Sequence, residues 1–325
     1  MTAKSTIAVA VVTYNSEHVI ANCLERLGNP LDTEIVVLDN ASTDNTIDLV
    51  QDSFPSVRII ESSENLGFAK AVNIVASSVN SDQILLLNPD ALLNGETLRD
   101  LSRHLSEDSE AVAYAPLVRD PESEFSTIGA GLRPSIWRMF LHASGLSRLS
   151  GRFPLLRGHY FFNHDLLGSR TSVDWASGGC LLIKMDAWKR VGGLSERWFM
   201  YAEDVDLCLR LRAEGNLIKV DKTLTALHQV GGSSTNVDGR VGTVWIVNLF
   251  DLYKSSISRG LLHSGTWKFI VVGGFAGRSA VYASLSRLPG TKKQSRRINS
   301  LRFRLYATAL WRESIRLEKR EETHG

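Results

Sequence analysis

Cysteine is scarce in this sequence, and its placement excludes two kinds of stabilised small domain. The 325-residue chain has three cysteines, Cys23, Cys180 and Cys208, which are odd in number and far apart. A disulfide framework needs cysteines in pairs, and a cysteine zinc site needs them closely spaced. The sequence therefore predicts a fold that depends on its hydrophobic core, in a reducing compartment such as the cytoplasm.

Long apolar runs and a large charge excess are absent as well. The N-terminus has no signal-peptide cleavage pattern, so we do not expect secretion. The apolar run 269–277 lies between Lys268 and Arg278 and is far shorter than the ~20 residues of a spanning helix. The formal net charge is +2 and 43% of the residues are hydrophobic. These values predict a globular protein of one large or two ordinary domains, without a nucleic-acid partner.

The phosphate-binding loops of two large enzyme classes are missing. Nothing after the first apolar segment matches Gly-x-Gly-x-x-Gly, and no Walker loop occurs. A dinucleotide-dependent oxidoreductase and a P-loop enzyme are thus disfavoured. A nucleotidyltransferase is also disfavoured, because residues 12–16 do not form the basic, glycine-rich loop that would hold a triphosphate.

The N-terminal half does contain a repeated pattern of strand, polar loop and helix. Short apolar segments rich in β-branched residues predict buried strands at 7–12, 34–38, 57–60 and 83–87. After the first strand, Ser16 is placed to cap a helix that ends at Gly28. This alternation predicts an α/β fold with a doubly wound sheet.

Polar loops follow four successive predicted strands. Ligands of such sheets bind beyond the carboxyl ends of the strands. Each loop taken alone is explained equally well as a turn or a helix cap, but four in succession favour a ligand site. The loops are 13–15, 39–44, 65–70 and 88–90.

Three carboxylates crowd into four positions farther along the chain. Glu203, Asp204 and Asp206 follow the aromatic run 198–201 and precede an apolar and basic helix-like segment. Like charges this close favour uptake of a proton by one of them, which is typical of a cleft that holds a general base. The alternative is a helix N-terminus, where acidic residues suit the macrodipole.

These motifs together resemble the family 2 glycosyltransferases, especially the bacterial rhamnosyltransferase-like branch. The resemblance covers about 7–234 and implies a GT-A fold, a Rossmann-like mixed sheet flanked by helices, with a helical C-terminal extension. It also implies transfer of a sugar from a nucleotide diphosphate to an acceptor hydroxyl, with inversion at the anomeric carbon. The ordered motifs are Val12-Thr13-Tyr14-Asn15, Asp39-Asn40-Ala41-Ser42-Thr43-Asp44, Asn65-Leu66-Gly67-Phe68, Asn88-Pro89-Asp90, Trp175-Ala176-Ser177-Gly178-Gly179, Glu203-Asp204-Val205-Asp206, and His228 with Gly232-Ser233.

The resemblance implies a set of residues around the sugar-nucleotide donor. Asp39 is expected to hydrogen-bond the base or ribose, and Gly67 to allow close approach of the backbone. Lys70 is either a donor contact or a solvated surface lysine. The full set is Thr13, Tyr14, Asn15, Asp39, Asn65, Gly67, Lys70, Asn88, Asp90, Gly178 and Gly179.

A divalent metal, Mg²⁺ or Mn²⁺, is the implied cofactor. It would neutralise the leaving diphosphate through Asp90, the last residue of what is usually an Asp-x-Asp motif. Asn88 stands where the first Asp is usual, which removes a charge and leaves both the metal affinity and the metal dependence open at this point. His228 is either a structural histidine or, as the resemblance implies, a second metal or diphosphate contact.

Catalysis and acceptor binding are assigned by the same resemblance. Asp204 is expected to be the base that takes the proton of the acceptor hydroxyl, with Glu203 as an acceptor contact or the alternative base. Asp206 is expected to cap the following helix. Trp175, Arg133 and Arg138 are the further acceptor candidates. The arginines are interleaved with aromatic residues, which suits either an anionic acceptor such as a polyprenyl-diphosphate-linked glycan or a solvated surface.

The expected organisation is a glycosyltransferase domain followed by a basic tail. The domain spans 1–236, with a nucleotide-sugar-binding half (1–118) and an acceptor and catalytic half (119–236). The region 237–325 is expected to be helical and basic, lying on the inner face of the cell membrane, on its own domain or on a partner subunit in a homodimer.

The predicted reaction is rhamnosyl transfer in the assembly of a cell-surface glycan. The branch implies dTDP-L-rhamnose as the donor. UDP-galactofuranose, UDP-glucose and UDP-N-acetylglucosamine are the alternatives, as is a non-catalytic protein that binds nucleotide sugars on the same fold.

Overall fold

The computed structural model describes residues 6–119, 127–228 and 242–322. The chain forms two compact units. The first unit contains Met1–Gly131 and Phe161–Thr235, and the second contains Leu132–Tyr160 and Asn236–Gly325. Residues 132–160, which the sequence pattern groups with the first domain, thus cluster with the C-terminal helices.

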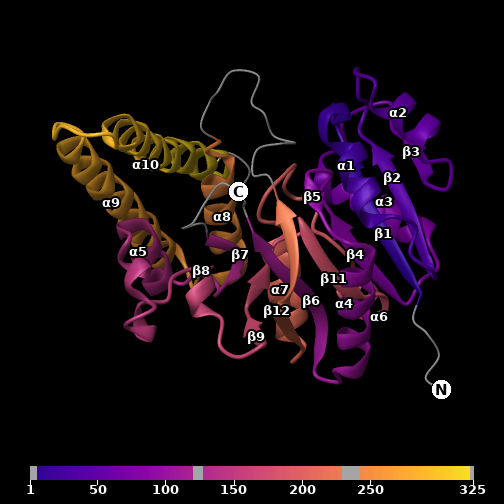
Figure 1. Cartoon of the computed structure of the whole chain (residues 1–325). Helices are drawn as coiled ribbons and strands as arrows, with labels where there is room; N and C mark the ends of the chain where they lie inside the picture. Colours follow the sequence, from indigo (N-terminus) through magenta and orange to yellow (C-terminus); the bar gives the residue numbers. More distant parts are fainter. Residues whose placement is uncertain (1–5, 120–126, 229–241, 323–325) are drawn as a thin grey trace. The chain divides into compact units, whose positions relative to one another are not determined.

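A mixed sheet forms the centre of the first unit (Figure 1). In this sheet β1 (Ile7–Thr13) pairs in parallel with β2 (Thr33–Asp39) and β4 (Gln83–Leu87), and β3 (Arg58–Glu61) pairs in parallel with β2 at the edge. These four strands confirm the predicted ones. Most of β1, β2 and β4 is buried because their apolar side chains point to both faces of a sheet that helices cover, whereas the edge strand β3 is only partly buried.

The other half of the sheet contains antiparallel pairs. β11 (Cys180–Lys184) runs antiparallel to β4, and the order continues through β6, β12 and β5. The remaining strands of this sheet are β5 (Ala91–Leu92), β6 (Ala111–Arg119), β12 (Leu217–His228) and β9 (Arg170–Val173), which pairs with β12. A separate three-stranded sheet has the order β10 (Trp175–Ala176), β7 (Thr127–Gly131) and β8 (Tyr160–Phe162). The predicted fold class, an α/β fold with a mixed sheet flanked by helices, is confirmed.

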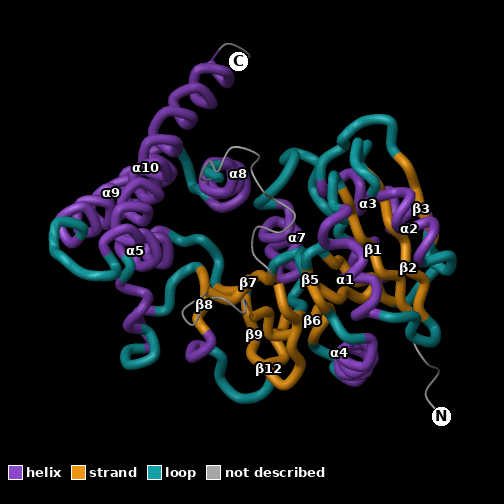
Figure 2. Tube along the Cα trace, turned by 45° about the horizontal axis from the view of Figure 1, so that its top comes forward, coloured by secondary structure: helices purple, strands orange, loops and turns teal. Residues whose placement is uncertain are grey.

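Helices of the first unit pack around this sheet (Figure 2). Helix α1 buries the apolar positions that predicted it, although Ser16 contributes its carbonyl rather than its hydroxyl to the first turn. Helix α7 begins at Glu203, so Asp206 lies inside its first turn and does not cap it. The helices are α1 (Glu17–Leu27), α2 (Thr46–Ser53), α3 (Phe68–Ser78), α4 (Gly95–Glu107), α6 (Met185–Arg190) and α7 (Glu203–Ala213), with the 3₁₀ turn η3 (Asn163–Asp165).

The second unit is helical. Helix α5 packs on α9, where the Trp267 indole donates to the Pro134 carbonyl at 2.7 Å. The apolar run 269–277 lies inside the longer α9. Among the described residues, no helix combines the length and the apolar composition needed to cross a bilayer. The elements are α5 (Ile136–Ser144), η1 (Leu146–Leu149), η2 (Pro154–Leu156), α8 (Val244–Leu252), the π-helical turn η4 (Tyr253–Ile257), α9 (Leu261–Leu285) and α10 (Lys293–Glu322).

One close contact places the segment before α7 against the start of α3. Gly67 has a φ of 78° and a ψ of 175°, a backbone region that is essentially restricted to glycine. A Cβ at Gly67 would lie 2.5 Å from the carbonyl oxygen of Phe199, and the next amide, Phe68, donates to that same oxygen at 3.0 Å. Glycine is therefore required here for the approach of Phe199, in addition to the expected approach of a ligand.

We expect Gly67→Ala to lower the free energy of unfolding by about 3 kcal/mol, because backbone strain of roughly 1–3 kcal/mol adds to the clash with Phe199. Gly28→Ala is the matched control. Gly28 has a similar backbone (φ 68°, ψ −152°), and nothing lies within 4 Å of its Cβ position. Urea unfolding of both variants measures the difference; equal losses would show that the Phe199 contact contributes nothing.

Candidate active site

A cavity of about 330 Å³ lies in the first unit. The ends of β1 and β4, the start of α3, the loop between β10 and β11, and the start of α7 form its walls. Its lining consists of Val12, Thr13, Tyr14, Ser16, Asn40, Asn65, Gly67, Phe68, Asn88, Pro89, Asp90, Ser177, Gly178, Gly179, Phe199, Met200, Tyr201, Glu203 and Asp204. Polar loops at several strand ends thus meet the acidic cluster around one space.

Most of the predicted site residues lie in this lining, and seven do not. Four of the seven are close in sequence to lining residues but are not part of the lining: Asn15, Asp39, Lys70 and Trp175. Asp39 and Trp175 are buried, and Lys70 is exposed. Arg133 and Arg138 belong to the second unit, where Arg138 donates to the carbonyl of Arg157. The side chain of His228 lies outside the described ones. Contact of Asp39 or Trp175 with a substrate would need neighbouring side chains to move.

The two carboxyl groups at the start of α7 differ in their hydrogen bonds. Asp204 accepts from the Gly178 amide at 3.1 Å, from the Val205 amide at 2.7 Å and from the Ser177 hydroxyl. Glu203 is only 4% exposed, and its Oε2 has no hydrogen-bond partner among the described residues. Donors stabilise an anion, so the negative charge of the pair belongs on Asp204 and the proton on Glu203.

The pKa values of the pair follow from burial. Burial raises the pKa of Glu203 to about 8, and the neighbouring charge of Asp204 adds to this effect. Burial also raises the pKa of Asp204, while its three hydrogen-bond donors oppose the rise. Because the two groups are adjacent, they titrate as a pair that holds one proton near neutral pH. One member is ionised and able to accept a proton there.

The backbone just before the pair is strained. Tyr201 and Ala202 have φ values of 67° and 80°, in the left-handed region that residues with a side chain disfavour at roughly 1–3 kcal/mol each. The Ala202 carbonyl nevertheless accepts the Asp206 amide at 2.8 Å, so α7 starts immediately. This turn directs Glu203 and Asp204 of the first helical turn into the cavity.

Two side chains hold the segment that leads to this turn. Asn73 of α3 accepts from the Leu194 amide at 3.0 Å and donates to the Leu194 carbonyl at 2.9 Å. Arg210 of α7 pairs with Asp206 at 2.7 Å and donates to the carbonyls of Val191 and Gly193. Together with the contact at Gly67, these bonds hold the strained turn between α3 and α7.

The polar loops after β1 and β2 are joined by internal hydrogen bonds. Asp39 accepts from the Thr13 hydroxyl at 2.8 Å and from the hydroxyl and amide of Ser42. Asp44 accepts from the amides of Glu17 and Thr46, which join the starts of α1 and α2 and lower the pKa of Asp44. Both carboxylates therefore shape the loops, and the predicted contact of Asp39 with the nucleotide stays a prediction.

The charge of the lining bears on the expected metal. Its titratable acidic groups are Asp90, Glu203 and Asp204, and no lysine or arginine is among the lining residues. A diphosphate would thus meet carboxylates without a protein cation, so a bound cation suits the site. Asp90 and the amide oxygen of Asn88 are suitable ligands for Mg²⁺ or Mn²⁺. Pairing of β12 with β5 places the backbone of His228 opposite Ala91, the residue after Asp90. The described residues contain no cluster of three metal-ligating side chains.

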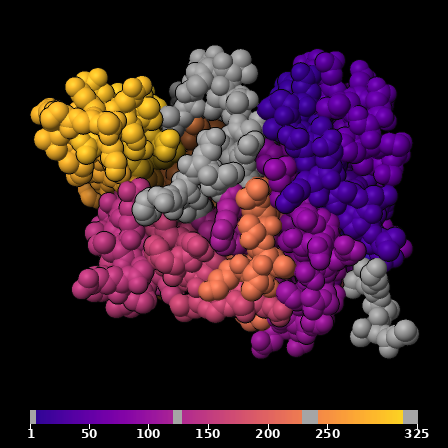
Figure 3. Space-filling view, in the orientation of Figure 1, coloured from indigo at the N-terminus to yellow at the C-terminus, as the bar shows by residue number. Residues whose placement is uncertain are grey.

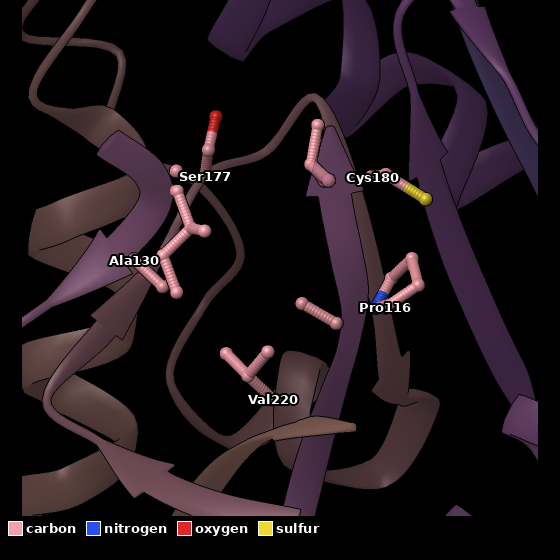
Figure 4. A pocket seen from close by; sticks show the side chains of 9 residues that line it. Pro116, Ala130, Ser177, Cys180 and Val220 are labelled. Atoms are coloured by element: carbon pink, nitrogen blue, oxygen red, sulfur yellow. The ribbon is translucent and has the colours of Figure 1, made fainter. Parts of the chain in front are cut away.

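A second, much smaller cavity lies beside the first (Figure 4). Its volume is about 10 Å³, barely enough for one water molecule, and most of its lining is apolar, including Pro116, Ala130 and Val220. Ser177 lines both cavities. This space cannot hold a substrate, but it leaves the region behind Ser177 loosely filled.

Sequence reasoning missed several lining residues. Ser177 and Asn40 lie inside motifs that were recognised, but without an assigned role; Asn40 links the loops after β2 and before α3 by bonds to Leu66 and Gly67. Phe199, Met200 and Tyr201 have exposed side chains and line the cavity. An aromatic run directly before the acidic cluster was the available signal for them.

Comparison with known proteins agrees with this geometry. Residues 8–164 match the family model for glycosyl transferase family 2. The N-acetylglucosaminyl-diphospho-decaprenol L-rhamnosyltransferase of Mycobacterium tuberculosis is 31% identical over 239 residues, covering 70% of this chain and 76% of the relative. The dTDP-rhamnosyl transferase RfbF of Shigella flexneri is 23% identical over 238 residues, covering 72% and 73%.

A solved structure has a similar fold. It is the mannosyltransferase PcManGT of Pyrobaculum calidifontis in complex with GDP-Man and Mn²⁺, with a TM-score of 0.59 at 16% identity, covering 97% of this chain and 88% of that one. The architecture is accordingly the GT-A fold. The protein is a glycosyltransferase that belongs to family 2, in its rhamnosyltransferase-like branch.

Proposed function

We propose that this glycosyltransferase transfers L-rhamnose from dTDP-L-rhamnose to a hydroxyl group of a lipid-linked glycan, with inversion at the anomeric carbon. One observation carries the proposal: Asp90 after β4 and Asp204 at the start of α7 line the same cavity. The names of two relatives, one a transferase acting on a diphospho-decaprenol substrate and one a dTDP-rhamnosyl transferase, support the substrates.

In this proposal Asp204 is the general base. Direct displacement with inversion needs a base on the face of the sugar opposite the leaving diphosphate. Asp204 is the ionised member of the pair, and it is held in place by Gly178, Val205 and Ser177. Glu203, protonated near neutral pH, is a hydrogen-bond donor for the acceptor.

The donor lies in this scheme against the strand ends of the same cavity. Thr13, Tyr14 and Asn65 line the side where the nucleotide is expected, and Gly178 and Gly179 the side of the sugar. Mg²⁺ or Mn²⁺, held by Asp90 and His228 with the Asn88 amide close to Asp90, would neutralise the leaving diphosphate when bound. Phe199, Met200 and Tyr201 present exposed apolar surface to the acceptor.

A panel of sugar nucleotides tests the donor. We expect dTDP-L-rhamnose to raise the unfolding temperature and to be hydrolysed slowly, both more strongly with Mn²⁺ than with a chelator. UDP-galactofuranose, UDP-glucose and UDP-N-acetylglucosamine are the comparison donors. If one of these donors raises the unfolding temperature more than dTDP-L-rhamnose does, that donor replaces dTDP-L-rhamnose in the proposal. A higher unfolding temperature without hydrolysis or transfer would favour a non-catalytic binding protein.

Asp204→Asn and Glu203→Gln distinguish the roles of the two carboxyls. The first removes the base, so kcat should fall by about 10²–10⁴-fold while donor binding remains. The second replaces a protonated carboxyl by a neutral group of the same shape, so kcat should stay within about tenfold. Equal losses in the two variants, measured by transfer and by calorimetric donor binding, would contradict the assignment.

The stability of these proteins gives a second readout. The folded pKa of Glu203 is raised from 4.5 to about 8, so the wild type loses stability as the pH rises between those values. We expect Glu203→Gln to remove this loss and to melt above the wild type at pH 8. The measurement is the unfolding temperature of the wild type and of Glu203→Gln at several pH values between 5 and 9. If the two proteins show the same dependence on pH, Glu203 is not buried in its protonated form.

Ser177→Ala should shift the pH dependence of transfer. Loss of the hydroxyl removes one donor to Asp204, so the pKa of Asp204 rises and the acid limb of the kcat profile moves up by about one pH unit. Ser172→Ala removes an exposed hydroxyl in β9, outside the cavity, and is the control. If kcat falls but the acid limb of its pH profile stays at the same pH, Ser177 acts only through packing.

A further inference from the structure

The near-neutral chain is strongly polarised between its two units. The first unit has 29 acidic and 16 basic residues, and the second has 21 basic and 6 acidic residues. Residues 252–312 contain no aspartate or glutamate. The same stretch carries twelve cations: Lys254, Arg259, Lys268, Arg278, Arg287, Lys292, Lys293, Arg296, Arg297, Arg302, Arg304 and Arg312.

Helix α9 lacks the charged outer face of an ordinary surface helix. Every fully exposed position along its 25 residues is uncharged. Leu262 is 90% exposed and Phe269 is 71% exposed, although both could be polar at no cost to the fold. The exposed positions are Leu261, Leu262, Thr266, Phe269, Gly273, Ala276, Gly277, Ala280, Val281, Ser284 and Leu285, and we call them the α9 outer face.

The two cations within α9 are turned onto aromatic rings. Lys268 lies 5.6 Å from the ring of Trp311, and Arg278 lies 4.0 Å from the ring of Phe303. The buried side of α9 packs through Trp267, Val271 and Phe275. The α9 outer face is therefore left uncharged for about 37 Å, at 1.5 Å per residue, with Arg259 before it and Arg287 after it. Its large exposed apolar side chains are Leu261, Leu262, Phe269, Val281 and Leu285.

We propose that the α9 outer face and the cations of the α9–α10 pair form a docking surface for an anionic lipid bilayer. Figure 3 shows this pair, in yellow, as a continuous surface. An apolar stripe with flanking lysines and arginines is the composition of helices that lie in the membrane interface, where apolar side chains enter the acyl boundary and cations meet the headgroups. The negative field of the bilayer would attract the second unit and repel the acidic first unit, which orients the enzyme.

Other occupants fit this surface less well. A second copy would bring the same excess of cations, so a symmetric contact through this face is repulsive. A nucleic acid would satisfy the cations but would leave the apolar stripe in water. A bilayer matches both features. The idea that docking brings the enzyme to a lipid-linked acceptor rests on the proposed function. The docking itself is argued from charge and exposure alone and does not rest on it.

Vesicle co-sedimentation of the full chain tests the proposal. We expect binding to vesicles of phosphatidylcholine with phosphatidylglycerol, weak binding to phosphatidylcholine alone, and loss of binding at high salt. Leu262→Glu with Phe269→Glu should weaken binding to the anionic vesicles by roughly tenfold or more. Leu31→Glu is the matched control, because Leu31 is 72% exposed and lies in the first unit; it should bind like the wild type.

Three results would overturn the proposal: equal binding to neutral and anionic vesicles, wild-type binding by the double variant, or binding of DNA but not of vesicles. If the double variant does not fold, a triple variant takes its place and must bind anionic vesicles more weakly than the wild type. It combines Lys292→Gln, Lys293→Gln and Arg297→Gln, which are all at exposed positions. No sugar donor is present in this assay. A wrong substrate assignment would therefore leave its outcome unchanged, and transfer to a soluble acceptor by the double variant would remain at the wild-type rate.

Discussion

The structure depends on keeping two adjacent carboxyl groups together at the edge of one cavity. Burial disfavours the charge of each, and their proximity disfavours two charges together, so the pair retains a proton up to about pH 8. The hydrogen bonds decide which carboxyl is ionised. The amides of Gly178 and Val205 point to Asp204, whereas Oε2 of Glu203 has no partner among the described residues. A base and a neutral donor thus arise from two neighbouring residues of one helix.

Such an arrangement is unfavourable locally, so it needs support from elsewhere. Two left-handed residues precede the pair, and their strain persists because Gly67, Asn73 and Arg210 hold the segment from three directions. Gly67 lines the cavity, whereas Asn73 and Arg210 lie outside its lining and act on the segment that leads to the turn. Residues of this kind trade stability for function, which is typical of active sites.

Much of this fold and site was predictable from the sequence because the signals were local. Buried strands followed by polar loops have a recognisable pattern, and the ends of neighbouring parallel strands must meet at one edge. Ser177 could not be assigned in this way, since its role comes from a fold that brings β10 close to α7. Asp39 shows a second limit: the sequence places a carboxylate at a strand end, but only the structure shows that it also accepts hydrogen bonds from Thr13 and Ser42. Residues 132–160 cluster with the C-terminal helices through tertiary contacts such as Trp267 to Pro134, which local sequence patterns do not contain.

Net charge was the most misleading property of the sequence, because an average over the chain conceals how the charges are divided. Among the described residues, the cavity of the acidic unit has carboxylates and no lysine or arginine in its lining, so a bound cation would suit a diphosphate donor there. The basic unit has an excess of fixed cations and one uncharged helical face, which suits an extended anionic surface. A metal ion can leave with a spent diphosphate, whereas fixed lysines and arginines would retain it. In the proposed scheme, release of the product and retention at a surface call for different kinds of positive charge, and most of the fixed cations in excess belong to the second unit.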